Sequence, residues 1–319
     1  MTPTPHDALV RAIFGQPQYA AEELRAVLPS TVLAELRLDT LAPIEGSFID
    51  EGLRQSSADL LFTVNLRGGG SGFVYVLFEH QSTPDERMPL RLLRYQTRIW
   101  ERHAAERPEE PRVPPILPLL MHHGSKPWPW KPCFSSILAI DDRGVAAFGR
   151  HVVGFDFVLD DLAQQTDAQI LGRAMDAIAR LALIALRSSR NRPRLFEHVA
   201  SVMQALESEL RGPAVVPALA RLGRYVFEVD DSPPDVVRSA FTAALSPEIR
   251  SSVMSTADML RAEGALEALR EGLLEQLDIK FGPLDPAVRS RLEQAPLEQV
   301  TAWMRRFAIV STLGEVFDS

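Results

Sequence analysis

The sequence has very little cysteine: Cys133 is the single one among 319 residues. An intramolecular disulfide and a cysteine metal cluster are therefore excluded. The first residues do not form a positively charged segment followed by an apolar run, so a signal peptide is not expected. No apolar stretch approaches the length of a membrane span. We therefore expect a cytoplasmic protein that does not enter a membrane.

Lysine is also scarce, since Lys126, Lys131 and Lys280 are the only three and nearly all the positive charge is arginine. The formal net charge is −8. Nucleic-acid binding is driven by cationic side chains that displace counterions, so a nucleic-acid partner would require a local basic face. The hydrophobic content of 46% and the charged content of 24% are typical of a soluble globular protein.

The most informative stretch is a predicted β-hairpin over residues 58–82. Two apolar runs, Leu60–Leu66 and Phe73–Phe78, are rich in β-branched and aromatic residues. They flank a glycine-rich break at residues 68–72, which is the pattern of two strands joined by a loop.

Polar side chains lie at the start of the first strand of this hairpin and at the end of the second. Asp59 opens the first strand, while Glu79 and Gln81 close the second. Glu79 and Gln81 share one face because side chains alternate along a strand, and Asp59 joins them only if it pairs with residue 79 or 81. Carboxylate and amide oxygens suit Mg²⁺. The alternative is that both acids are solvated residues at strand ends.

Several segments of the sequence resemble those of one protein family. They are HDALVRAIF from His6, SFIDEGLRQSSADLLF from Ser47, FEHQS from Phe78, MPLRLLRYQTRIWERH from Met88 and ILPLLMHHG from Ile116. Together with an acid before one strand and E-x-Q at the end of the next, they resemble the Rpn family. These are the YhgA-like putative transposases, also described as recombination-promoting nucleases of the PD-(D/E)xK superfamily. Gln81 stands where that superfamily usually has lysine.

This resemblance implies a mixed α/β (α+β) fold of the restriction-endonuclease-like type, with a central sheet flanked by helices, followed by an all-helical C-terminal half. It implies that Asp59 and Glu79 bind Mg²⁺, with the His80 carbonyl as a third ligand and Mn²⁺ or Ca²⁺ as substitutes. Asp59, Glu79 and Gln81 would form the catalytic set. Asp7 or Glu22 would supply an auxiliary acid from the first helices, and Gln96 a polar group facing the site. An ordinary helix-capping role is the alternative for the acids.

A stripe of arginines follows the hairpin. Its members recur at spacings of three or four residues along one helix face, and are Arg87, Arg91, Arg94, Arg98 and Arg102. Guanidinium groups match phosphate oxygens, so we expect Arg87, Arg91, Arg94 and Arg98 to bind DNA. The alternative is a solvated face that pairs with Glu86 and Glu101.

Later segments complete the predicted architecture. Strands are expected at Ile116–Met121 and Val152–Leu159, and helices from Asp167 onward. His122 and His123 should point to opposite faces of their strand, which favours structural or hydrogen-bonding roles over a shared metal ion. We place a nuclease core at 1–165, a helical extension packed on it at 166–280 and a small helical appendage at 281–319.

These observations predict a metal-dependent DNA endonuclease linked to recombination or mobile-element activity. One alternative is a catalytically weak DNA-binding accessory protein of a mobile element or defence system, because Gln81 lacks the charge of lysine. Another is an oligomeric scaffold, a homo-oligomer formed through the C-terminal helices.

Overall fold

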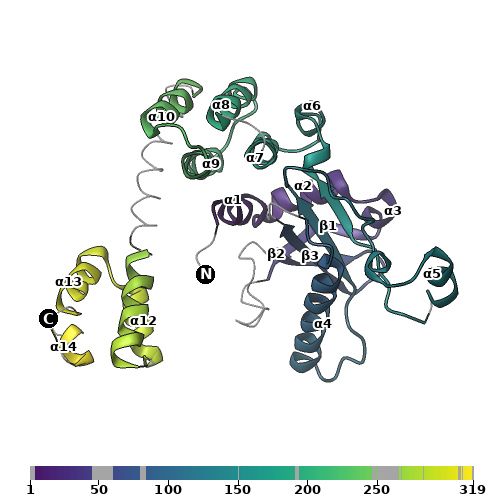
Figure 1. Ribbon diagram of the computed structural model, residues 1–319, viewed down its shortest axis with the longest axis horizontal. Coiled ribbons are helices and arrows are strands. Elements are labelled where there is room, and N and C mark those ends of the chain that lie inside the picture. Colours follow the sequence, from purple (N-terminus) through teal and green to yellow (C-terminus); the bar gives the residue numbers. More distant parts are fainter. Residues whose placement is uncertain are drawn as a thin grey trace. The chain divides into compact units, whose positions relative to one another are not determined.

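The computed structural model describes residues 4–44, 60–79, 84–149, 151–190, 194–245, 250, 266, 268–282, 284–307, 310 and 312–317. The chain forms two compact units, 1–250 and 251–319. Figure 1 shows both units. In the described ranges no helix has the length and apolar character needed to cross a membrane.

The first unit is built on a five-stranded mixed sheet with the order β1-β2-β3-β4-β5. The strands are β1 (Leu36–Pro43), β2 (Leu60–Leu66), β3 (Ser71–Glu79), β4 (Ile116–His122) and β5 (Val158–Asp161). The first three are antiparallel neighbours, whereas β4 and β5 run parallel to β3. The predicted α/β class and the predicted hairpin are therefore confirmed.

Glycine allows the tight connection between β2 and β3. Leu66 donates its amide to the carbonyl of Gly70 at 3.1 Å, which closes the hairpin loop. Gly69 and Gly70 have φ angles of 91° and 83°. A side chain at either position would be strained, because this left-handed region favours residues without a Cβ atom.

Helix α4 (Met88–Glu106) covers one face of the sheet (Figure 1). Its apolar residues recur every three or four positions and so form one stripe. This stripe packs against side chains of β2 and β4 and against two residues of the later loops; the buried cluster comprises Leu61, Met88, Leu92, Tyr95, Ile99, Leu120, Trp128 and Phe157. The helix is thereby held beside the strands that carry the candidate site.

Helices α1 (Pro5–Phe14) and α2 (Pro17–Val27) lie on the opposite side. Thr4 caps α1, because its hydroxyl accepts from the Asp7 amide at 3.2 Å and its own amide donates to the Asp7 carboxylate at 3.1 Å. Helix α2 packs against β1 and β5. A short helix, α3 (Ser30–Leu33), leads into β1.

A helical extension completes the first unit. It contains α6 (Asp167–Leu171), α7 (Ala177–Ser188), α8 (Leu195–Ala205), α9 (Val215–Val229) and α10 (Pro234–Ala243). Helix α7 is buried along nearly its whole length, and α1 packs against both α7 and α9 (Figure 1). The N-terminal helix therefore joins the extension to the sheet.

The second unit has a hydrophobic core of its own. Residues 268–281 are helical and are followed by α12 (Pro286–Gln294), α13 (Leu297–Phe307) and α14 (Leu313–Phe317). Leu273 and Leu277 share this core with Leu292, Trp303 and Phe317. The boundary that the sequence places at residue 280 therefore falls inside one packed core. Self-association through these helices stays a prediction.

Two sequence expectations about strands need correction. The strand expected at Val152–Leu159 begins only at Val158, because Val152 and Val153 are exposed residues of the preceding loop. That loop also contains α5 (Asp142–Phe148), and short 3-10 turns lie at Phe134–Ile137 and Leu162–Gln164. The edge strand β1 was not expected, and its exposed positions outnumber its buried ones.

Candidate active site

Several strand ends meet at one edge of the sheet. Strand β2 begins there because it is antiparallel to β3, and β3, β4 and β5 end there because they are parallel. In the backbone register Glu79 pairs with His122, and His122 pairs with Asp161. The predicted E-x-Q triplet therefore begins at this edge.

The hairpin register differs from the one expected. Leu60 pairs with Val76, which is shifted by two residues from the pairing that would set Asp59 opposite residue 79. A shift of two keeps the parity on which the shared-face argument depends. Asp59, His80 and Gln81 lie outside the described residues, and Glu79 is described through its backbone pairing, so their roles stay predictions.

His122 is held rigidly at this edge. Its ring is fully buried, and Nε2 lies 2.9 Å from the carbonyl oxygen of Lys126. The ring of Trp128 packs edge-on against it with centroids 5.4 Å apart. A Cβ atom at Gly124 would lie 2.5 Å from Cε1 of His122, so glycine is required there. The ring therefore has one defined position.

Asp161 supports the same arrangement from β5. Its carboxylate accepts from the Trp128 amide at 2.8 Å, from the Ala163 amide at 3.1 Å and from Gln164 Nε2 at 2.7 Å. These donors occupy both carboxylate oxygens. Asp161 therefore fixes the segment that contains Trp128 and is a structural residue of this edge.

His123 faces the other side of the sheet, as the alternation along a strand predicts. Its ring lies 4.8 Å, centroid to centroid, from the ring of His6 in α1. Nδ1 of His6 lies 2.9 Å from the hydroxyl of Tyr225, and burial raises the pKa of that hydroxyl. The expectation that His122 and His123 occupy opposite faces is confirmed.

The acids expected from the first helices have structural contacts. Asp7 is buried and belongs to the cap of α1. Glu22 accepts the amide of Asp176 at 2.8 Å, just before α7. Gln96 lies on the buried side of α4, and its Nε2 has no hydrogen-bond partner in the part of the chain that is described. The roles of Asp7 and Gln96 in a site stay predictions.

A buried charge cluster at the end of β5 was not expected from the sequence. Arg173 Nη1 lies 2.9 Å from Glu23 Oε2, and Nη2 lies 2.6 Å from Asp160 Oδ1. Burial raises the pKa of Glu23 well above its usual range, and the nearby Asp160 carboxylate raises it further. One positive charge thus faces two carboxyl groups. No local pattern marks Glu23 and Arg173, which are 150 residues apart.

The arginine stripe of α4 divides into paired and unpaired members. Arg98 lies 3.7 Å from Glu101, and Arg102 lies 2.6 Å from Glu106. Arg91 Nε donates to the Tyr95 hydroxyl at 3.2 Å. These contacts are of the kind expected for a solvated face, although the partner of Arg102 is not one of the two acids expected.

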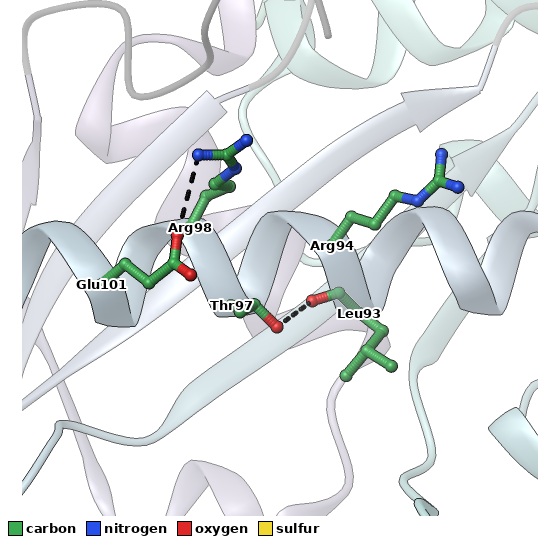
Figure 2. A pocket seen from close by; sticks show the side chains of 5 residues that line it. All are labelled: Leu93, Arg94, Thr97, Arg98 and Glu101. Atoms are coloured by element: carbon green, nitrogen blue, oxygen red, sulfur yellow. Dashed lines mark hydrogen bonds and ion pairs between the residues drawn. The ribbon is translucent and has the colours of Figure 1, made fainter.

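Arg87 and Arg94 are exposed, and neither guanidinium has an ion pair among the described residues. Arg94, Arg98 and Glu101 line a surface depression of about 480 Å³. In Figure 2 Arg98 turns toward Glu101, whereas Arg94 points away from both. Leu93 and Thr97 complete the lining of the depression. Positive charge on this face is therefore available for a partner mainly at Arg87 and Arg94.

Comparison with known proteins identifies the family. The model of the family described as "Putative transposase, YhgA-like" matches residues 4–215, which include all five strands. The chain belongs to this family. It is 30% identical over 261 residues to recombination-promoting nuclease RpnD of Escherichia coli O157:H7, covering 81% of this chain and 95% of the relative.

Other relatives of this YhgA-like family member carry two kinds of name. Recombination-promoting nuclease RpnA of Escherichia coli strain K12 is 30% identical over 262 residues, covering 82% of this chain and 85% of the relative. The inactive recombination-promoting nuclease-like protein RpnE of the same strain is 29% identical over 282 residues, covering 86% and 87%. No solved structure matches the chain significantly.

Proposed function

We propose that this member of the YhgA-like family is a metal-dependent DNA endonuclease that acts in recombination or element mobility. The observation that supports this most is the topology of the sheet edge. The antiparallel pair β2–β3 has Leu60, the first residue of β2, and Glu79, the last residue of β3, toward one edge of the sheet, beside the end of β4. The relatives named nucleases support the reaction class.

The predicted donors suit a hard divalent cation. Asp59 and Glu79 offer carboxylate oxygens and residue 80 offers a backbone carbonyl, which is the oxygen chemistry that Mg²⁺ prefers. A bound Mg²⁺ ion would polarise the scissile phosphate and lower the pKa of a coordinated water. Among the described residues no group of three histidines, cysteines or acids is arranged to hold a metal. The proposed centre therefore depends on Asp59 and Glu79.

Gln81 is expected to slow the proposed reaction. An amide orients a water or a phosphate oxygen by hydrogen bonding, but it carries no charge. The loss of one charge-stabilising donor from a nuclease centre costs about 3 kcal/mol in the barrier. Arg91 or Arg94 of α4 would supply part of this charge, so we propose slow cleavage.

The unpaired arginines of α4 are proposed to bind DNA. Arg87 and Arg94 are exposed at and beyond the start of the helix that follows β3, and Arg98 forms an ion pair with Glu101 at 3.7 Å. Phosphate contacts of this kind position a duplex without reading its sequence. Because the net charge is −8, DNA binding would depend on a local basic face such as this one.

A catalytically weak DNA-binding accessory protein is the second candidate. Gln81 in place of lysine favours it, as does the relative RpnE, whose name describes it as inactive. In this candidate the arginine stripe of α4 still binds DNA, but the phosphodiester bond is not cleaved.

One pair of measurements separates the two candidates. DNA binding is measured in Ca²⁺, and cleavage of supercoiled plasmid is measured in Mg²⁺ or Mn²⁺. An endonuclease cleaves the plasmid, and Asp59→Ala abolishes cleavage while DNA binding remains. An accessory protein binds DNA in Ca²⁺ and leaves the plasmid intact in both Mg²⁺ and Mn²⁺.

A further inference from the structure

The hydrogen bond of His122 fixes which ring nitrogen carries the proton. The Lys126 carbonyl oxygen can only accept, so Nε2 at 2.9 Å must donate. In the neutral ring Nδ1 then has a free lone pair. His122 is fully buried, and Nδ1 has no hydrogen-bond partner in the described part of the chain.

A buried acceptor without a partner requires an explanation, because nearly all buried polar groups are satisfied. A binding role is one such explanation. Histidines that bind metals almost always donate their other ring nitrogen to a backbone carbonyl, a carboxylate or water. His122 has this arrangement, with Nε2 on the Lys126 carbonyl and Nδ1 unoccupied.

The place of His122 in the sheet supports the same role. It is the last residue of β4, and the parallel register makes Glu79 its direct neighbour on β3. In this register the backbones of the two residues lie directly opposite each other, and neighbouring strands are about 4.8 Å apart. Trp128 and Gly124 hold the ring in place, and Asp161 is occupied by its own donors.

We propose that Nδ1 of His122 is a ligand of the divalent cation at the sheet edge, next to Glu79. This inference rests on the proposed nuclease function and adds a nitrogen to a donor set that otherwise consists of oxygen. Nitrogen ligands favour Mn²⁺ over Mg²⁺, which strongly prefers oxygen. The site should therefore bind Mn²⁺ more tightly than Mg²⁺.

Two substitutions separate a ligand role from a structural one. The amide nitrogen of glutamine overlies Nε2, so His122→Gln keeps the hydrogen bond to Lys126 and removes the Nδ1 donor. Asparagine places its amide oxygen near Nδ1, so His122→Asn loses the hydrogen bond but offers an oxygen ligand. His123→Gln is the matched control, because His123 is equally buried and faces the other side of the sheet.

The experiment uses the full chain and Mn²⁺ alone, without DNA. Mn²⁺ affinity is measured by calorimetry. Coordination by nitrogen is measured by pulsed electron paramagnetic resonance, in which a nitrogen ligand modulates the signal of the bound ion (nitrogen modulation). Circular dichroism confirms the fold of each variant. We expect nitrogen modulation in the parent and in His123→Gln, its loss in both His122 variants, and Mn²⁺ binding at least about tenfold weaker in His122→Gln.

Two results would overturn the inference. If Mn²⁺ binds the parent and Glu79→Gln abolishes binding, but the nitrogen modulation is absent or persists in His122→Asn, His122 is not a ligand and the proposed nuclease centre survives. If the parent does not bind Mn²⁺, or Glu79→Gln has no effect on binding, the proposed centre and the His122 ligand are both refuted.

Discussion

The buried cluster around Arg173 gives a quantitative prediction about stability. Its carboxylate partners are almost inaccessible, since the side chains of Glu23 and Asp160 are 5% and 2% exposed. Replacing Arg173 with methionine keeps the approximate length of the side chain and removes the cation. Removing one partner from a buried ion pair costs about 3–5 kcal/mol. With the cation gone, the two buried carboxyl groups lose their shared partner, and we expect a loss of about 3 kcal/mol.

The loss should depend on pH with a definite sign. The folded-state pKa of Glu23 is raised, so the stability contributed by its proton is complete below the ordinary pKa of glutamic acid and is lost as pH rises through the raised value. Without Arg173 the pKa of Glu23 should rise further, because the nearby cation that favours its ionised form is lost. The cost of Arg173→Met should therefore be smaller at about pH 5 than at about pH 8.

Urea unfolding followed by tryptophan fluorescence measures this cost. Three of the four tryptophans, Trp100, Trp128 and Trp130, belong to the first unit, so the signal reports mainly on it. The control is Arg173→Met combined with Asp160→Asn, which should regain part of the lost free energy because one of the two buried carboxyl groups is then neutral. A loss below about 1 kcal/mol at pH 8, or the same loss at both pH values, would refute the reasoning.

Three further predictions follow from single contacts. Gly124→Ala should lower the free energy of unfolding by about 1–3 kcal/mol, measured by urea titration, because its methyl group would overlap the ring of His122. Arg94→Ala should weaken DNA binding and reduce the slope of log affinity against log salt by about 1, whereas Arg102→Ala, already paired, should change it less; equal effects would argue against a role for the unpaired face. Tyr225→Phe should lower the melting temperature and cost about 1–3 kcal/mol, because a buried imidazole loses its hydrogen bond; an unchanged melting temperature would contradict this.

The sequence predicted the elements that have strong local patterns. The hairpin of β2 and β3 followed from two apolar runs and a glycine-rich break, and α4 followed from arginines that recur every three or four residues. Strand β1 was missed because an edge strand with many exposed positions lacks a continuous apolar run. The start of β5 was misplaced because the valines before Gly154 have strand propensity but lie exposed in a loop.

The candidate site was predictable only in part. An acid before one strand and an E-x-Q triplet after the next are local signals, so the edge of the sheet could be located from sequence. The role of His122 Nδ1 could not be predicted from the sequence. It depends on the hydrogen bond of Nε2 to a carbonyl four residues later and on the register with β3. The cluster of Glu23, Asp160 and Arg173 depends on tertiary packing alone.

The most direct test of a hydrolytic centre at the end of β3 is the rate of plasmid nicking in Mg²⁺ by Glu79→Gln. The matched control is Glu86→Gln, which changes an exposed acid of the following turn in the same way. We predict measurable nicking by the parent, unchanged nicking by the control and none by Glu79→Gln, with all three proteins folded. Equal nicking by the parent and Glu79→Gln would contradict the assignment of the centre to this edge.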